Sequence, residues 1–252
     1  MAALYHGFVK KWLWLVMLIG VWQVYSDRMR LLPSPSRTLQ TGIKLASSGD
    51  LLIYGIDSLA RVSEAMLIVC IVALPLGFLL GLSERANRYM NKLISLLRPL
   101  PPVAWIPLVV MVWGIQNKTA LFLICTGAFF PVLINTVDGV RGVQRIYVSA
   151  ATVLNASKFQ IIKDVILPAA LPSILTGVRI GIGIAWMLVV VAELVAVKSG
   201  LGYLILNGQL DMRLDVIIVG IAVIGFIGLV IDRFYQVFAR RICVTVRQIE
   251  ST

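Results

Sequence analysis

Arg179 and Glu193 are two ionisable residues inside a long apolar segment in the C-terminal half of the chain. A charge in such a segment is costly and usually faces a cavity or a partner, so each residue is a candidate for lining an ion pathway. They lie fourteen positions apart, close to four helical turns, and therefore share a helix face. They would stand roughly 21 Å apart along the axis and could not pair with each other.

Each of these charges also has a structural interpretation. Arg179 could snorkel to lipid phosphates, pair with a carboxylate such as Asp138 or Asp164, or line a conduit for an anion. Glu193 lies about one turn from the end of its segment. It could equally be an interfacial carboxylate that tethers the following loop.

The uncharged residues of the apolar segments allow pathway and packing interpretations. Trp105 and Trp186 could supply apolar walls suited to a short organic anion, although aromatic residues in such segments more often anchor or pack. Gly177, Gly181 and Ala185 recur every four residues and form a small-residue ridge for close helix packing. That packing could occur within the chain or across a two-fold axis.

Catalytic and cofactor chemistry finds no support in the sequence. The only histidine, His6, has no clustered carboxylates, so neither a catalytic nor a metal site is expected. The three cysteines, Cys70, Cys125 and Cys243, are isolated and lack metal-ligand or disulfide spacing. The chain has no Gly-Lys dipeptide and hence no Walker-type phosphate loop, so we expect it to bind no ATP, Mg²⁺ or other cofactor itself.

The composition places the chain in a lipid bilayer. Hydrophobic residues make up 59% of it and charged residues 14%, with a mean hydropathy of +0.92, too apolar to cover a soluble protein of 27.7 kDa. The net charge is +11, but the basic residues lie between apolar runs without interleaved aromatic residues. Nucleic acid is therefore not an expected partner.

An all-α membrane protein is predicted, with one transmembrane domain over residues 1–252 and a core over 59–238. Residues 31–52 are polar and amphipathic and are predicted to lie at the membrane surface. Residues 116–118 form a tight connection, which makes the spans on its two sides an antiparallel hairpin. Pro102, Pro107 and Pro131 predict irregular helices near the middle of the bundle. The six expected spans are residues 12–26, 59–82, 103–115, 119–137, 171–196 and 215–238.

The basic residues predict the orientation. If the N-terminus is inside, fourteen Lys and Arg residues fall on the cytoplasmic side and seven on the opposite side. Both termini are then cytoplasmic. The first span is expected to stay uncleaved, because Asp27-Arg28-Met29-Arg30 follows it in place of a small-residue cleavage site.

A polar, cationic loop of about residues 138–168 separates the fourth and fifth spans. It reads Ser149-Ala150-Ala151, three residues, Asn155, nine residues, then Val165-Ile166-Leu167-Pro168. Asn tolerates a left-handed backbone, so a turn is expected at Asn155. Ser149 could cap a short helix that begins at Ala150.

This pattern resembles the signature of the inner-membrane permease subunits of ATP-binding-cassette (ABC) importers: Glu-Ala-Ala, three residues, Gly, nine residues, a β-branched residue, any residue, then Leu-Pro. The spacing agrees, and Ser149 and Asn155 depart from the usual Glu and Gly. Further stretches look like the nitrate/sulfonate/taurine branch of these permeases: residues 32–35, 58–62, 76–82, 98–108, 192–194 and 199–204.

The resemblance implies a type I ABC importer permease of six transmembrane helices with a cytoplasmic coupling helix, in the bacterial inner membrane. It also implies a second, identical permease copy, two cytoplasmic ATPase subunits that hold ATP and Mg²⁺, and a periplasmic or lipid-anchored substrate-binding protein. The substrate would be a small anion such as taurine, an aliphatic sulfonate or nitrate. The expected ATPase-coupling residues are Ser149, Ala150, Ala151, Asn155, Ala156, Ser157, Phe159, Leu167 and Pro168.

The sequence argues against two other classes of membrane protein. A carrier or channel driven by an ion gradient would work without an ATPase, but it predicts more intramembrane ionisable groups or an inverted repeat, and neither is found. An intramembrane enzyme would need a nucleophile with its base or a metal constellation, which the sequence lacks. The sequence leaves the substrate open, as well as whether the two permease copies are identical.

Overall fold

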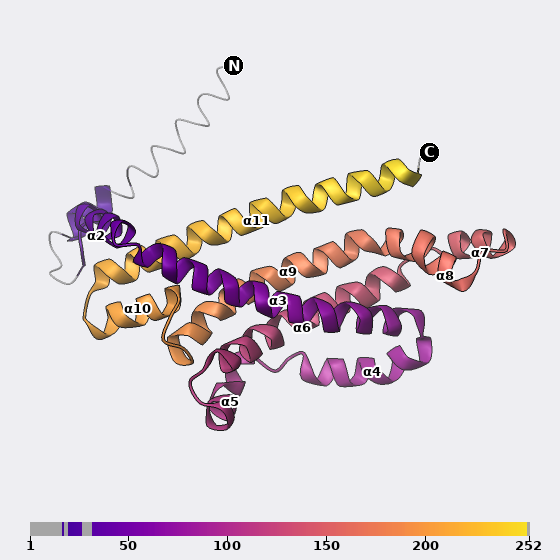
Figure 1. Cartoon of the computed structure of the whole chain (residues 1–252), viewed down its shortest axis with the longest axis horizontal. Helices are drawn as coiled ribbons and strands as arrows, with labels where there is room; N and C mark the ends of the chain where they lie inside the picture. The colour runs from indigo at the N-terminus through magenta and orange to yellow at the C-terminus, as the bar shows by residue number, and fades with distance from the viewer. Residues whose placement is uncertain (1–16, 18–19, 27–31, 251–252) are drawn as a thin grey trace, which may run out of the picture.

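The computed structural model describes residue 17, residues 20–26 and residues 32–250, and this part of the chain contains helices and no strand. The helices follow one another along a long bundle (Figure 1). In chain order after residue 32 they are α2 (Pro35–Ser47), α3 (Asp50–Leu82), α4 (Glu84–Leu97), η1 (Pro102–Trp105), α5 (Ile106–Trp113), α6 (Asn117–Arg141), α7 (Arg145–Val153), α8 (Lys158–Gln160), η2 (Ile161–Ile166), α9 (Leu167–Val195), α10 (Leu201–Leu210) and α11 (Leu214–Glu250).

Among the described residues, four helical stretches are long and apolar enough to cross a membrane: Asp50–Leu82, Asn117–Arg141, Lys158–Val195 and Leu214–Ile242. They confirm the predicted second, fourth, fifth and sixth spans. Each lies in a longer helix, except that the fifth was predicted to end at residue 196, one residue past the helix end. Of the predicted first span, residues 12–26, only residue 17 and residues 20–26 are described, so the structure does not test this span.

The predicted third span was wrong in its extent. It was placed at residues 103–115, whereas α4 and the η1–α5 unit together form one candidate span that is bent by 77° at its break. The basic residues of α4 had assigned it to a loop. Its apolar side nevertheless packs on the bundle, where Ile94 is buried and Ala86 and Met90 contact the core. The connection to α6 is tight, and the Trp113 and Phe122 rings meet edge to face across it at 5.6 Å.

Helix α6 forms the centre of the bundle and packs between α3 and α9 (Figure 1). The small-residue ridge of α9 faces it: a Cβ atom on Gly177 would lie 2.6 Å from Asn135 Cβ, and one on Gly181 would lie 2.9 Å from Val132 Cγ2. Such approaches are possible only without a side chain. The ridge therefore packs within the subunit.

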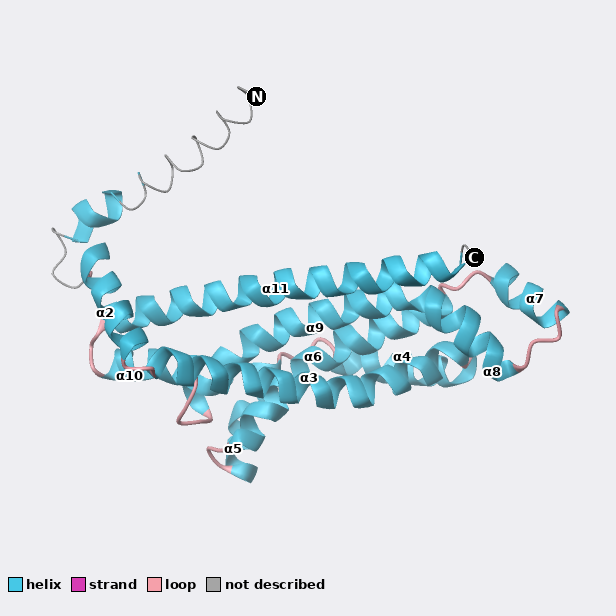
Figure 2. Cartoon of the chain, turned by 45° about the horizontal axis from the view of Figure 1, so that its top comes forward, coloured by secondary structure: helices cyan, strands magenta, loops and turns pink. Residues whose placement is uncertain are grey.

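The two ends of the bundle carry different elements. At one end α7 projects beyond the long helices, while α2 and α10 lie at the other end with the start of α11 (Figure 2). Helix α2 supplies the amphipathic helix predicted within residues 31–52, and Ser34 caps it by accepting a hydrogen bond from the Arg37 N–H. Thr41 of α2 donates to Asp215 of α11 across 2.7 Å, which fixes α2 on the bundle.

Candidate functional site

The segment between α6 and α9 is built around a left-handed turn at Asn155. Asn155 has φ of +56°, which confirms the prediction for this residue. The Asn155 N–H donates to Thr152 O at 3.0 Å, and the Ala156 N–H donates to Ala151 O at 3.0 Å. These two bonds are those of a Schellman motif, so Asn155 ends α7 in the manner of a C-terminal glycine.

The prediction that Ser149 caps a helix beginning at Ala150 was wrong. Helix α7 begins at Arg145 after Gln144, so Ser149 lies inside the helix and cannot cap it. The helical pattern extends further back than the motif itself. Ser157 is the capping residue of the next helix: its hydroxyl accepts from the Gln160 N–H, and the Gln160 side chain accepts from the Ser157 N–H at 2.8 Å.

Large apolar side chains are exposed on this projecting segment. Val153 is 81% exposed, Leu154 82% and Phe159 72%, on both sides of the Asn155 turn. Ala151 and Ala156 are half-buried between them. Large apolar side chains exposed on a projecting segment are typical of a protein interaction site.

The segment continues into the bundle without a break. Residues Ile161–Ile166 form a π-helix, in which the Leu167 N–H donates to Ile162 O, and α9 follows directly. Pro168 follows the π-helix directly and has no N–H to donate, so one backbone hydrogen bond of the continuous helix is not made there. Helix α8, η2 and α9 thus form one helical rod over Lys158–Val195, which links the exposed segment to the opposite end of the bundle.

Glu193 is fully buried in an ion pair with Arg61. Glu193 Oε1 lies 2.7 Å from Arg61 Nη1, with 0% of the Glu193 side chain exposed and 10% of the Arg61 side chain. The carboxylate also accepts from the Ser58 hydroxyl at 2.8 Å and from the Gly202 N–H at 2.9 Å. Glu193 therefore ties the loop after its own helix to α3.

Arg61 completes this buried network. It donates to Asn117 Oδ1 at 2.8 Å and to Ser199 O at 3.0 Å, and its guanidinium also contacts the Ser199 hydroxyl. The network joins α3, the start of α6, the end of α9 and the loop before α10. Arg61 was missed as a site residue, although its charge within the predicted span 59–82 is the same signal that identified Glu193.

Arg179 pairs with a different helix from those considered. Its Nε lies 2.9 Å from Asp232 Oδ1 and its Nη2 3.2 Å from Oδ2, and both side chains are about half exposed, at 47% and 46%. The partner is thus Asp232 of α11 rather than Asp138 or Asp164. As expected from their separation, Arg179 and Glu193 do not pair with each other. A pathway role for Arg179 stays a prediction.

The two tryptophans lie in packing environments. Trp186 is 8% exposed, and its Nε1 donates to Ile224 O of α11 at 3.1 Å. Trp105 packs against a small cluster that contains Leu123 and Ala192. Their contribution to a pathway also stays a prediction.

A cavity of about 440 Å³ lies elsewhere, where the α4–α5 span breaks. It opens between this break and the middle parts of α6 and α9, and none of the four predicted pathway residues lines it. Among the described residues that line the cavity, Arg98 is the only charged one. The cavity is also lined by Pro102, Thr126, Phe130, Asn135 and Ile184.

Residues 73–244 match the family described as binding-protein-dependent transport system inner membrane component. The chain belongs to this family. A chain of Methanocaldococcus jannaschii named as an ABC transporter permease protein is 41% identical, over 85% of this chain and 84% of its own. The Bacillus subtilis chain SsuC, named for aliphatic sulfonates transport, is 35% identical over 94% and 87%. TauC, the taurine transport system permease protein of Escherichia coli, is 34% identical over 90% and 86%.

A chain of the MetNI methionine ABC transporter has the same fold, with a TM-score of 0.66 and 19% identity over 76% of this chain and 96% of that one. The expected type I importer fold and the nitrate/sulfonate/taurine branch are thereby confirmed. The protein is a multi-pass inner-membrane permease and a transport subunit, not an enzyme. ATP hydrolysis belongs to a separate ATPase subunit, and the family works with a substrate-binding protein.

Proposed function

We propose that this permease acts as one of two identical copies that import a small anion delivered by a periplasmic or lipid-anchored binding protein. Two cytoplasmic ATPase subunits hold ATP and Mg²⁺ and drive the cycle, while the permease binds no cofactor itself. The single observation that carries this proposal is the exposed apolar segment around Asn155, joined without a break to the rod Lys158–Val195.

The ATPase docks on this segment. A partner that binds the exposed turn at one end of the continuous helical rod Lys158–Val195 can move the whole rod. Val153, Leu154 and Phe159 supply the exposed apolar contacts. The residues assigned to coupling are Ser149, Ala150, Ala151, Asn155, Ala156, Ser157, Phe159, Leu167 and Pro168.

The proposed substrate is an anion because the related permeases SsuC and TauC are named for aliphatic sulfonates and for taurine. Taurine, aliphatic sulfonates, nitrate and bicarbonate share a compact anionic oxygen group. A positive charge in a low-dielectric pathway favours such a group over a cation.

The test is uptake by the complete importer. We expect proteoliposomes that contain the permease, its ATPase and its binding protein to accumulate at least one of taurine, ethanesulfonate, nitrate and bicarbonate when ATP is supplied. Without the ATPase, a proton or sodium gradient should support no uptake above empty liposomes. Gradient-driven uptake by the permease alone would establish the carrier alternative instead.

The orientation makes a separate prediction, with both termini and the Asn155 turn in the cytoplasm. Cysteines at positions 87, 157 and 248 should be protected from an impermeant thiol reagent in intact cells, in a background without native cysteines. Cysteines at positions 42 and 198 should be labelled. Ser157 and Lys198 are both exposed in the structure, so strong labelling at 157 in intact cells would reverse the orientation.

A further inference from the structure

Helix α4 has one apolar and one basic side. Ala86, Met90 and Ile94 pack against the main core, whereas Arg85 and Arg88 are exposed on the other side. Lys92 continues the basic side one turn further along the helix. None of these three basic residues forms an ion pair with a described residue.

This basic helix runs beside an uncharged part of the bundle. Helix α4 turns back next to α3 directly after Leu82 (Figure 1), and its 14 residues extend about 21 Å. Residues 65–82 of α3 contain no charge, as expected of a segment in hydrocarbon. Basic residues at that depth face water or a partner rather than lipid, so the basic side of α4 is not a lipid-facing surface.

The cavity at the end of α4 lies at the same depth. Cys125 Sγ of α6 lies 3.6 Å from Ala65 O, and a Cβ on Gly77 would lie 2.7 Å from Thr136 Cβ. Residues 125–136 of α6 therefore lie beside residues 65–77 of α3. The α6 residues that line the cavity fall within this stretch, from Thr126 to Asn135.

Arg98 brings an unpaired positive charge into this cavity. It follows the last residue of α4, is exposed, and has no carboxylate within ion-pair distance in the described chain. By contrast, the charge of Arg179 is neutralised by Asp232. Asn135 uses one of its amide protons on Pro131 O and retains the other. The Thr126 hydroxyl donates to Phe122 O within α6, so the cavity combines a guanidinium, one free amide donor and apolar walls.

We propose that this cavity is the anion-binding site of the pathway, with Arg98 as the residue that binds the anionic oxygen group and the basic side of α4 as its approach. The proposal rests on the anion import proposed above. A volume of about 440 Å³ accommodates a short organic sulfonate as well as a bare inorganic anion. The break in the α4–α5 span has a physical reason here, because irregular backbone at membrane depth is tolerated where it lines a cavity.

The test restores the charge chemically. Arg98→Cys is made in an importer whose native cysteines are replaced by Ala, and ATP-driven uptake of taurine, ethanesulfonate, nitrate and bicarbonate is measured. Loss of a charge-assisted contact should lower uptake at least about tenfold. Modification with the cationic methanethiosulfonate ethylammonium should restore much of it, whereas uncharged methyl methanethiosulfonate should not.

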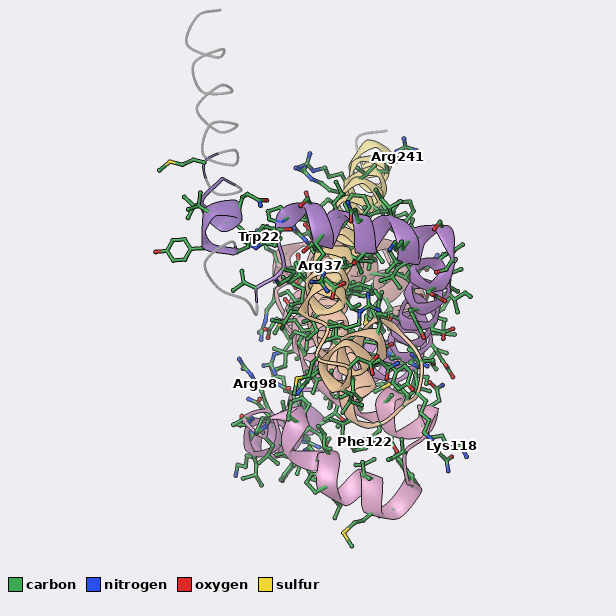
Figure 3. The ribbon with its side chains drawn as sticks, turned by 90° about the vertical axis from the view of Figure 1, so that its left-hand side faces the viewer. Trp22, Arg37, Arg98, Lys118, Phe122 and Arg241 are labelled. Carbon is green, nitrogen blue, oxygen red and sulfur yellow. The ribbon has the colours of Figure 1, made fainter. Side chains whose placement is uncertain are left out.

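Lys118→Cys is the matched control, because it removes the same charge from the opposite side of the bundle (Figure 3). It should transport within about twofold of its parent with either reagent, since an exposed charge away from the site contributes little. Whichever of the four anions is transported should also slow the reaction of the cysteine at position 98 with the methanethiosulfonate reagents. Protection by phosphatidylglycerol vesicles and not by the probe would identify a lipid headgroup as the ligand and overturn the proposal.

The remaining outcomes separate the two proposals. Normal uptake by Arg98→Cys, or equal rescue by both reagents, would overturn the assignment of Arg98 while leaving anion import intact. Wild-type importer that takes up none of the four probes would overturn both. Rescue by the cationic reagent alone, with substrate protection at position 98 and an unaffected Lys118→Cys control, supports the site.

Discussion

Replacing Arg61 by Met is expected to destabilise the permease by about 3–5 kcal/mol, because the change leaves the Glu193 carboxylate buried without its counter-charge. The side chain of Glu193 has no exposed surface, so water cannot replace the lost partner. Glu193→Ala should have a similar effect, since it strands Arg61. The measurement is the thermal unfolding midpoint of the purified protein in detergent.

The double variant Arg61→Met/Glu193→Met separates the ion pair from simple loss of packing. Removing both charges leaves neither one uncompensated, so the double variant should regain much of the stability that either single variant loses. Arg179→Met is the control on a half-exposed pair and should lose less. Additive losses in the double variant would contradict a coupled, buried pair.

Asn155→Pro is expected to abolish substrate-stimulated ATP hydrolysis and uptake while leaving membrane insertion intact. Proline cannot adopt the φ of +56° found at Asn155, and it removes the N–H that donates to Thr152 O. The turn that presents the docking segment is therefore lost. Ala151→Glu should have the same effect, because it places a charged, larger side chain at a half-buried position beside the exposed surface.

Asn155→Gly is the matched control. Glycine adopts the left-handed conformation without strain and keeps its backbone N–H, so coupling should persist near the wild-type level. Stimulated hydrolysis and transport that survive both Asn155→Pro and Ala151→Glu, with the ATPase still bound, would show that this segment does not transmit the ATPase motion.

The features predicted from the sequence are those set by local chemistry. Asn155 adopts the left-handed turn because few other residues tolerate it, and long apolar runs become long helices wherever their composition leaves no alternative. The small-residue ridge at Gly177 and Gly181 predicted close helix packing, but only the structure showed that α6 is the helix it packs against. The sequence therefore predicted the architecture well and the pairing of helices poorly.

The features that were missed depend on tertiary context. The basic residues of α4 indicated a loop, because no local signal shows that its apolar side packs against α3 and the core. Asp232 lies 53 residues beyond Arg179, so their pairing could not be deduced from spacing. Ser149 showed the opposite error: a residue type suited to capping lies inside a helix because the helical pattern begins earlier.

The most direct test of the account is the distance between spin labels on Ser157→Cys in the two permease copies of the assembled importer. If the ATPases pull the exposed segments around Asn155 of the two copies together, the distance between the labels at position 157 should shorten when ATP is bound with vanadate present. Labels on Lys198→Cys at the other end should move apart, because the rod Lys158–Val195 carries the motion through the bundle. An unchanged distance at position 157 in a complex that hydrolyses ATP would contradict the central claim.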